Sequence, residues 1–299
     1  MTTPGTTARW RRLLAHPGTG RFGIAVAILA TVAIAAVTLP ALPSFTPWPA
    51  LLGLLPWTIG KYVLCPLRWH ALSESGRPRS WHAAAYAESE LLGLLTPGHV
   101  GADLWRIRRL ARAGMPRLSA VAEVALDRFV GAVGLALFVG FAATALPMRM
   151  AVSAACLLAA AVVLLLLLRR FRPAWVPQRK LPAPGQLVRG LLLSVGYQAS
   201  IVALLVGTLA ATGQSVPPLA VLGAFGASQL AGAVPGPNGA SPRDAALVVA
   251  LFALGVPWPA ALGAVSLKAL LAWAPALLLG GSCLLFARRR STGAAPAGG

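Results

Sequence analysis

The sequence predicts an all-α polytopic membrane protein, with about six full spans and two re-entrant helical hairpins in an inverted repeat. Three observations favour this fold class. Hydrophobic residues make up 57% of the 299 residues and charged residues only 11%, and the mean hydropathy is +0.74. Soluble domains carry roughly a quarter charged residues. An ordinary soluble enzyme and a disordered tail protein are therefore excluded.

The apolar runs define the elements in chain order. A run of about 18 or more nearly uncharged residues is long enough to cross the hydrocarbon core of a bilayer. Six runs meet this condition: 22–39, 50–67, 119–146, 151–168, 190–212 and 259–286. Residues 22–290 therefore form one predicted transmembrane domain. It follows a basic, cytoplasmic segment at 1–21 and precedes a small, polar tail at 291–299 that we expect to be disordered.

Two further apolar segments are too short to cross. Segments 82–96 and 219–234 are each followed by Pro-Gly. A helix rises 1.5 Å per residue, so 15 residues reach only about 22 Å, whereas the hydrocarbon core is about 30 Å thick. We therefore expect both segments to be half-helices of re-entrant hairpins.

The basic residues indicate how the chain is oriented. The net charge is +19, from 26 basic and 7 acidic residues. Most basic residues lie in loops that share one side of the predicted membrane, and the opposite loops hold only Arg149. The positive-inside rule then places both termini in the cytoplasm. Richness in Arg, Ala, Gly and Pro is typical of a GC-rich bacterial genome, so we expect a multi-pass protein of the bacterial inner membrane. It would contact anionic lipid and no nucleic acid.

The strongest signal in the sequence is an internal repeat. Residues 89–102 and 228–240 share the pattern S-[EQ]-L-x-G, a short apolar step and then P-G-x-x-G-A. By the charge rule the two copies enter from opposite sides, so repeat 1 (about 50–146) and repeat 2 (about 190–286) are inverted. Such repeats are typical of transporters, whose binding site lies at the repeat interface; chance similarity in a Gly-, Ala- and Leu-rich chain is the alternative. The match continues at an offset of about 140 through Asp103 with Asp244, Gly-Met-Pro at 114–116 with Gly-Val-Pro at 255–257, and Ala120 with Ala261.

The two hairpin tips are candidate anion sites. A Pro-Gly stretch at membrane depth survives only beside protein or a wet cavity, and exposed N–H groups at the start of a helix bind anions. The backbone N–H groups at Gly98, Gly101, Gly236 and Gly239 are therefore candidate ligands for a lipid headgroup. The alternative for each Pro-Gly is an ordinary surface turn.

Acidic residues at membrane depth are costly and mark ion or substrate paths. Asp103 and Asp244 follow the two tips, where each could carry a proton or pair with a cation. Asp244 could instead cap the helix that begins near residue 245. Glu90 lies on the first half-helix, and Gln229 replaces it in the other copy, which makes Glu90 a candidate coupling site.

Further charges lie within predicted spans. Glu123 and Asp127 are one helical turn apart, with Arg128 next to them, and Lys268 lies at similar depth in the other repeat. They indicate either a charged cavity or buried structural pairs. Lys61, in the second span, could simply snorkel to the interface.

Arg106 is the basic residue nearest the first Pro-Gly-x-x-Gly turn. An Arg guanidinium grips phosphate with two parallel hydrogen bonds, so Arg106 is a candidate headgroup ligand. The positive-inside rule is the alternative for the arginines between 106 and 117. His99, at the first tip, could shuttle protons or serve as a hydrogen-bonded turn residue.

Several motifs resemble one known family. Arg68-Trp69, the stretch from Pro97-Gly98 to Asp103 and Arg106, and Asp127-Arg128 with Gly131 resemble the lysylphosphatidylglycerol synthase transmembrane family of flippase-like proteins. The resemblance covers about 20–286. It implies translocation of a lipid or polyprenyl-linked headgroup.

The sequence departs from the family pattern in two ways. Asp103 and Asp244 stand where the family commonly has Glu, and Lys268 stands near a common Arg. The 299 residues leave no room for the soluble aminoacyl-transferring domain of some larger members, so lipid lysylation is not implied.

The sequence therefore predicts a lipid flippase or transporter for a phospholipid or a polyprenyl-phosphate-linked headgroup. Arg106, Arg128, Lys268 and the four tip glycines would hold an anionic headgroup, and Asp103, Asp244, Glu90 and Asp127 would carry protons or balance charge. One alternative is an accessory subunit that docks a glycosyltransferase and transports nothing. Another is an enzyme acting on lipid phosphates, with Glu123 and Asp127 as acid and base, although no nucleophile or metal motif accompanies them. No cofactor is expected.

Overall fold

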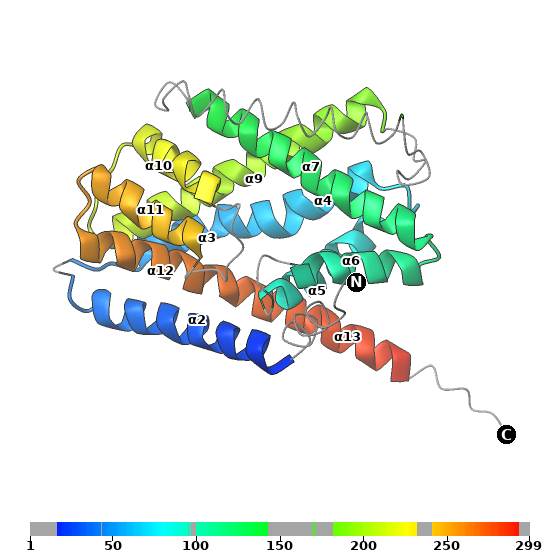
Figure 1. The fold of residues 1–299 in the computed structure, drawn as a ribbon, viewed down its shortest axis with the longest axis horizontal. Helices are drawn as coiled ribbons and strands as arrows, with labels where there is room; N and C mark the ends of the chain where they lie inside the picture. Colours follow the sequence, from blue (N-terminus) through cyan, green and yellow to red (C-terminus); the bar gives the residue numbers. More distant parts are fainter. Residues whose placement is uncertain are drawn as a thin grey trace, which may run out of the picture.

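The computed structural model describes residues 17–42, 44–94, 96, 100–142, 170, 182–231 and 241–292. Over these ranges the regular structure is helical, with no strand (Figure 1). In chain order the elements are α2 (Pro17–Thr38), α3 (Trp48–Ile59), the π-helical turn η1 (Gly60–Leu64), α4 (Cys65–Leu72), α5 (Arg79–Leu94), α6 (Val100–Arg112), α7 (Arg117–Ala142), α9 (Pro184–Ala211), α10 (Pro218–Ala231), α11 (Pro242–Ala253), α12 (Trp258–Pro275), the π-helical turn η5 (Ala276–Gly280) and α13 (Gly281–Thr292).

Among the described residues, three helices are long and apolar enough to cross a membrane. They are Trp48–Leu72, Pro184–Ala211 and Trp258–Phe286. They correspond to three of the six predicted spans. Of the other three, 22–39 falls on α2 and 119–146 falls largely on α7, while 151–168 lies outside the described residues.

The long helix of α3, η1 and α4 runs through the middle of the molecule (Figure 1). It packs against α9, which in turn contacts α7, α10 and α12. Small residues allow this approach, because a Cβ atom on Gly53 would lie only 2.8 Å from the carbonyl oxygen of Ala203. In η1 the N–H of Cys65 donates to the carbonyl of Gly60, one residue further back than in an α-helix. Such π-turns are frequent at functional sites.

Three predicted boundaries need correction. The second span does not end before Arg68: the helix continues to Leu72, and Arg68 lies inside it with only 5% of its surface exposed. Helix α2 begins at Pro17, inside the segment predicted as a basic N-terminus, and α13 reaches Thr292, inside the predicted tail. Residues 293–299 lie outside the described residues.

The two short predicted segments are short helices, each followed by another. Helices α5 and α10 have 16 and 14 residues, and α6 and α11 have 13 and 12. Helix α5 packs against α6, and α10 packs against α11. The Pro-Gly tips at 97–99 and 232–240 lie outside the described residues.

The turns that end α6 and α11 have the same geometry. Gly114 and Gly255 have φ of +98° and +87°, a conformation that favours glycine. In each turn the next residue donates its N–H to the carbonyl five positions earlier, at 3.1 and 3.2 Å. This is the hydrogen bond of a Schellman motif, and both turns lie where the sequence repeat aligns them.

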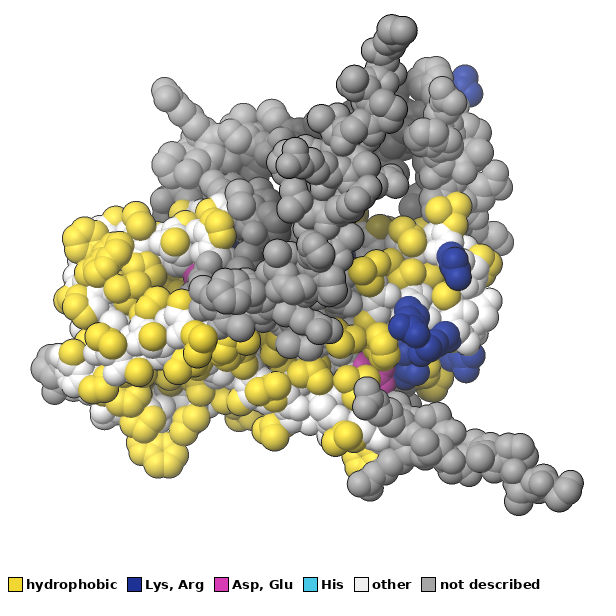
Figure 2. Space-filling view, turned by 60° about the horizontal axis from the view of Figure 1, so that its bottom comes forward, with side chains coloured by type: hydrophobic (Ala, Val, Ile, Leu, Met, Phe, Trp, Pro, Cys, Tyr) yellow, Lys and Arg dark blue, Asp and Glu magenta, His cyan; other side chains and the backbone are white. Residues whose placement is uncertain are grey.

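Apolar side chains cover much of the outer surface. Figure 2 shows hydrophobic side chains over most of the described surface in that view, with Lys and Arg gathered at one side. Large exposed apolar residues occur on α2, α3, α9, α11 and η5. A contiguous apolar surface of this kind is typical of contact with lipid.

Candidate functional site

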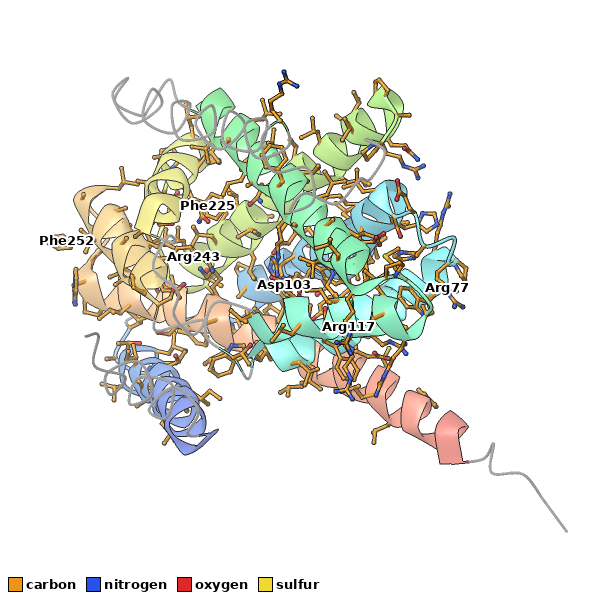
Figure 3. All side chains as sticks on the ribbon, turned by 45° about the vertical axis from the view of Figure 1, so that its right-hand side comes forward. Arg77, Asp103, Arg117, Phe225, Arg243 and Phe252 are labelled. Carbon is orange, nitrogen blue, oxygen red and sulfur yellow. The ribbon has the colours of Figure 1, made fainter. Side chains whose placement is uncertain are left out.

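A central cavity of about 370 Å³ lies between the two helix pairs. Both halves of the chain build it, because its lining residues come from α3, η1, α4, α5, α7, α9, α10, α11, α12 and η5. Figure 3 shows Arg243 on the side of α11 that faces the interior. The charged described residues in its lining are five basic and two acidic: Lys61, Arg68, Arg128, Arg243, Lys268, Glu90 and Asp244.

Lys61 and Glu90 form an ion pair in this cavity. The Nζ of Lys61, on η1, lies 2.8 Å from Oε2 of Glu90, on α5. It also donates to the hydroxyl of Tyr197 at 3.4 Å and lies 5.8 Å from the ring centroid of Tyr86. The ammonium group is therefore held within the cavity by α5 and α9, and the expected alternative of snorkelling does not describe it.

Asp244 takes part in helix capping and in an ion pair, but α11 begins at Pro242 and its N-cap residue is Ser241, with Asp244 as the third residue of a capping box. Its N–H donates to Oγ of Ser241 at 3.2 Å, and that hydroxyl donates to Oδ2 of Asp244 at 2.5 Å. The Nζ of Lys268, on α12, lies 3.3 Å from Oδ1. The two interpretations of Asp244 are thus compatible, because each uses a different carboxylate oxygen.

The first half contains the matching ion pair. Arg128, on α7, donates from Nε to Oδ1 of Asp103, on α6, at 2.9 Å, and its terminal nitrogen lies 2.9 Å from the same oxygen. Asp103 and Asp244 are aligned by the sequence repeat, and each pairs with a cation of the next helix. Arg128 lines the cavity, whereas Asp103 is not among the lining residues.

A second group of charges is buried behind the cavity. Asp127 accepts from Nε of Arg68 at 2.8 Å and from a terminal nitrogen of Arg106 at 2.7 Å. The Arg106 guanidinium lies 4.3 Å from the ring centroid of Trp69. A Cβ atom on Gly131 would lie 3.0 Å from Arg68, so glycine makes room for this cluster. Five of the residues that carry the family resemblance, Arg68, Trp69, Arg106, Asp127 and Gly131, therefore meet in one place.

Arg106 and Asp127 are 1% and 0% exposed, and neither lines the cavity. Their side chains form a buried structural pair, which was one of the two interpretations left open for Asp127. A headgroup in the cavity would meet Arg128, Arg243 and Lys268 instead. Arg106 contacts the cavity wall through Asp127, which holds Arg68, and its guanidinium lies 5.4 Å from the ring centroid of Tyr86.

Glu123 belongs to another buried network. Its carboxylate accepts from the indole N–H of Trp69 at 2.9 Å, from Oγ of Ser73 at 2.6 Å and from the backbone N–H of Glu74 at 3.2 Å. With Asp127 held by two arginines and Glu123 outside the cavity, the two carboxylates do not face a common substrate. This geometry gives no support to an acid–base enzyme.

Of the four backbone N–H groups predicted to bind a headgroup, the structure describes only that of Gly101, and it is hydrogen-bonded within the protein. The N–H of Gly101 donates to Oγ1 of Thr96 at 2.8 Å. Gly98, Gly236, Gly239 and His99 lie outside the described residues.

Sequence reasoning did not single out three polar residues that line the cavity, Tyr62, Gln198 and Arg243. It named Arg68 as a motif residue but ended the predicted span before it. Gln198 carried a usable signal, because a lone amide in the middle of a long apolar run is costly unless it has a role.

The comparisons with known proteins agree with the motifs. The family model described as "Lysylphosphatidylglycerol synthase TM region" matches residues 20–280. No curated protein matches the chain. The match covers most of the chain and includes every described residue of the cavity and of the Arg68–Asp127–Arg106 cluster. The chain therefore belongs to the lysylphosphatidylglycerol synthase transmembrane-region family.

Proposed function

We propose that the protein is a lipid flippase of the bacterial inner membrane and that the anionic headgroup of its substrate occupies the central cavity. The observation that carries this proposal is the charged lining of a cavity built by both halves of an apolar, all-helical molecule. Charged side chains at membrane depth are expensive and mark substrate paths. The substrate would be a phospholipid or a polyprenyl-phosphate-linked lipid.

The net positive charge of the cavity lining favours an anion. Its described charged residues are five basic and two acidic, and both acids already pair with a lysine. Arg68 is held by Asp127 and Arg128 by Asp103. Arg243 pairs with no carboxylate among the described residues. A phosphate would balance this surplus and give the Arg128 and Arg243 guanidinium groups an acceptor that suits their planar forks.

The lipid-facing residues support two hairpins that enter from opposite sides. Along α6 the exposed positions one turn apart are Val100, Leu104, Arg108 and Arg112, so this face changes from apolar to basic. Along α11 the exposed face stays apolar through Val249 and Phe252 and is followed by exposed Trp258. Arginine at one end fits the cytoplasmic interface, and an uncharged aromatic end fits the opposite interface.

This arrangement supports the architecture of about six spans, two re-entrant hairpins and an inverted repeat, with both termini in the cytoplasm. Four short helices of 12 to 16 residues reach only part of the way across a bilayer. Two half-length hairpins that meet at the midplane would place their tips next to the cavity. Substrate would then reach the cavity from either leaflet as one repeat moves against the other.

The ion pairs suggest how binding is balanced. In the structure Asp103, Asp244 and Glu90 pair with Arg128, Lys268 and Lys61. An incoming phosphate competes for the same cations. Each displaced carboxylate would then take up a proton or turn to water, which couples headgroup entry to charge compensation in the cavity.

A reconstitution experiment tests the proposal. The full chain is placed in phosphatidylcholine vesicles with trace phosphatidylglycerol labelled on its acyl chain, and a membrane-impermeant reagent destroys the label in the outer leaflet. We expect the wild type to expose nearly all of the label. The Arg128→Gln/Lys268→Met variant should slow this at least about tenfold, because charged hydrogen bonds contribute about 1.5–3 kcal/mol each.

Arg112→Gln is the matched control, because Arg112 is an exposed arginine of α6 outside the cavity. It should leave the rate unchanged. Destruction of only the outer-leaflet half of the label with the wild type would refute flipping of this lipid class.

A further inference from the structure

We infer that the headgroup carries an uncharged, hydroxyl-rich unit, a sugar or another polyol, next to its phosphate. This inference rests on the proposed function and names the class of substrate for the same cavity. It follows from the neutral hydrogen-bonding side chains of the cavity wall.

Three neutral side chains with hydrogen-bonding groups line the cavity: Trp57, Tyr62 and Gln198. The hydroxyl oxygen of Tyr62 is buried and has no hydrogen-bond partner among the described residues. A buried polar group without a partner costs about 1–3 kcal/mol, so such groups are normally satisfied. An unpartnered hydroxyl in the same cavity as an indole N–H and a carboxamide indicates a ligand that supplies both donors and acceptors.

These groups come from different elements than the substrate-facing charges. Trp57 and Tyr62 lie on α3 and η1, and Gln198 lies on α9, which packs against α3. Arg128, Arg243 and Lys268 come from α7, α11 and α12. One wall is therefore built to hold a phosphate and another to hold a neutral polar group attached to it.

The neutral wall has the composition that suits a sugar or polyol. The rings of Trp57 and Tyr62 are in edge-to-face contact, with centroids 6.2 Å apart. Aromatic rings give a flat apolar surface with a polar handle, on which the C–H face of a sugar ring can pack. The Gln198 carboxamide offers one acceptor and two donors, and hydroxyl groups both donate and accept.

Other headgroups fit this lining less well. An amine-bearing headgroup would add a cation to a cavity whose two described acids are already paired with lysines. A bare phosphate would satisfy the basic wall alone. It would leave the Tyr62 hydroxyl unpaired and would fill only a small part of about 370 Å³.

Lipid binding to the purified full chain tests the inference. Native mass spectrometry in mild detergent would compare phosphatidic acid, phosphatidylethanolamine, phosphatidylglycerol, phosphatidylinositol, a polyprenyl phosphate and a polyprenyl phosphoryl hexose. We expect each polyol-bearing lipid to bind at least about tenfold tighter than the matching lipid without the polyol. A lipid without the polyol would leave polar groups of the cavity wall without hydrogen-bond partners. A phosphate with a polyol can be carried by a glycerolipid or by a polyprenyl lipid, and comparing the two sets of lipids shows which of these the protein binds.

Variants then assign the preference to the neutral wall. Tyr62→Phe removes one oxygen atom, and Gln198→Leu replaces the amide with a side chain of similar size. Each should lower the ratio of polyol-lipid to bare-phosphate binding, and the double variant should bring it near one. Gln214→Leu is the control, because Gln214 does not line the cavity, and it should keep the wild-type ratio.

The outcomes separate the inference from the proposed function. Equal binding of phosphatidic acid and phosphatidylinositol by the wild type would overturn the inference and leave the headgroup proposal standing. A ratio unchanged in the double variant would overturn the role of Tyr62 and Gln198. Binding of all these lipids that does not change in Arg128→Gln/Lys268→Met would refute the cavity as the headgroup site, and the inference with it.

Discussion

The helix pairs α5–α6 and α10–α11, each with its following helix α7 or α12, have similar backbones and different interiors. Both pairs end in a turn with a left-handed glycine, at Gly114 and Gly255. Both place a fully buried alanine early in the next helix, Ala120 and Ala261. Both pair the aspartate that follows the tip with a cation of that helix. The shared features are thus the turn, the close helix contact and one ion pair at the cavity.

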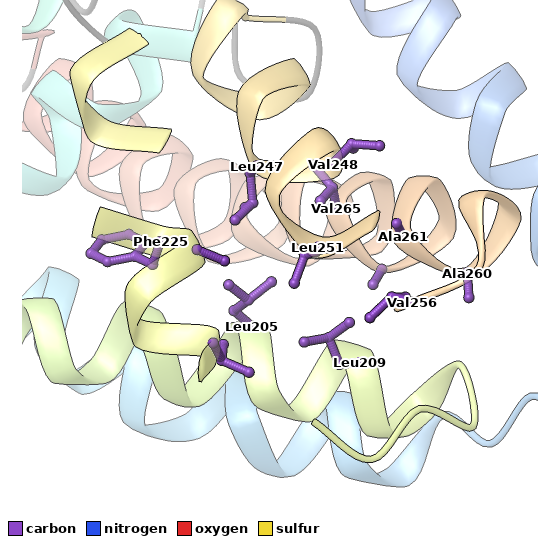
Figure 4. Close-up of a cluster of buried hydrophobic side chains, with 13 residues drawn as sticks. Leu205, Leu209, Phe225, Leu247, Val248, Leu251, Val256, Ala260, Ala261 and Val265 are labelled. Carbon is purple, nitrogen blue, oxygen red and sulfur yellow. The ribbon is translucent and has the colours of Figure 1, made fainter. Parts of the chain in front are cut away.

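The interiors behind the cavity differ. Asp103 and Asp244 are 141 positions apart. At the same spacing Arg106 corresponds to Leu247, and Glu123 corresponds to Ala264. The first half buries an ion cluster around Asp127, whereas the second buries an apolar cluster that includes Leu247 and Leu251 (Figure 4).

This difference separates two kinds of charge. Arg106 and Glu123 belong to the first half alone, because their counterparts Leu247 and Ala264 are apolar, whereas Asp127 corresponds to Lys268 at the same spacing. The Asp103–Arg128 and Asp244–Lys268 pairs line or adjoin the cavity. We therefore propose that these two pairs serve the substrate and that the Arg106–Asp127 pair stabilises the first half.

The largest expected effect is from Asp127→Ala, which breaks the charged interior. It leaves Arg68 and Arg106 buried without their shared carboxylate, and removing one partner of a buried pair costs about 3–5 kcal/mol. The free energy of unfolding in detergent, followed by circular dichroism, measures the loss. A cost below about 1 kcal/mol would show that the cluster does not hold the first half together.

The apolar interior should respond somewhat less to a single change. Leu251→Ala removes a fully buried side chain from the second half and should cost about 2–4 kcal/mol through lost packing and the cavity it leaves. The equivalent Leu110→Ala in the first half should cost a similar amount, because Leu110 is also fully buried. Unequal losses, measured in the same unfolding experiment, would show that the two leucines are not packed equivalently in the two halves.

The two turns give a matched pair of smaller effects. Gly114→Ala and Gly255→Ala each place a Cβ atom in the left-handed region, at a cost of about 1–2 kcal/mol. Gly140→Ala is the control, because this helical glycine of α7 has no neighbouring atom within 4 Å of an added Cβ, and it should be neutral or stabilising. Thermal unfolding of the three variants side by side makes the comparison. If the alanine variant at either turn is as stable as the wild type, that turn does not need a glycine and is not a shared feature of the two halves.

The smallest effect tests the one asymmetric acid in the cavity. Glu90→Gln gives the first half the amide that the second half has at Gln229, and it removes the carboxylate that holds Lys61. Anionic lipid should then bind about three- to tenfold tighter, a change of about 1 kcal/mol. The reciprocal Gln229→Glu should weaken binding. Native mass spectrometry measures both, and weaker binding by Glu90→Gln would contradict the balancing role of Glu90.

Much of the fold follows from the sequence, because apolar run length and turn chemistry are local signals. Hydropathy located the long helices at 50–67, 190–212 and 259–286, and Pro-Gly marked the ends of α5 and α10. The repeat aligned Asp103 with Asp244 before any contact was known. Local patterns could do this because each depends on residues close together in the chain.

The site was only partly predictable, because its partners are distant in sequence. A hydropathy window ends a span at Arg68, yet Asp127, 59 positions away, removes the cost of burying that charge. Lys61 likewise finds Glu90 only after folding. Whether Arg106 contacts a headgroup or forms a structural pair depends on its contact with Asp127, which is 21 positions away. The sequence alone therefore left both possibilities open.

The most direct test of the central claim is whether an anionic headgroup enters the cavity. Ala272 lines the cavity, whereas Arg112 is exposed at the basic end of α6 and does not line it. The thiols of Ala272→Cys and Arg112→Cys would be modified with a negatively charged, water-soluble reagent, and peptide mass spectrometry would follow each site with and without phosphatidylglycerol. We predict that the lipid slows modification at position 272 at least about tenfold, as expected for a site it occupies, and leaves position 112 unchanged. Equal rates at position 272 with and without the lipid would contradict the account.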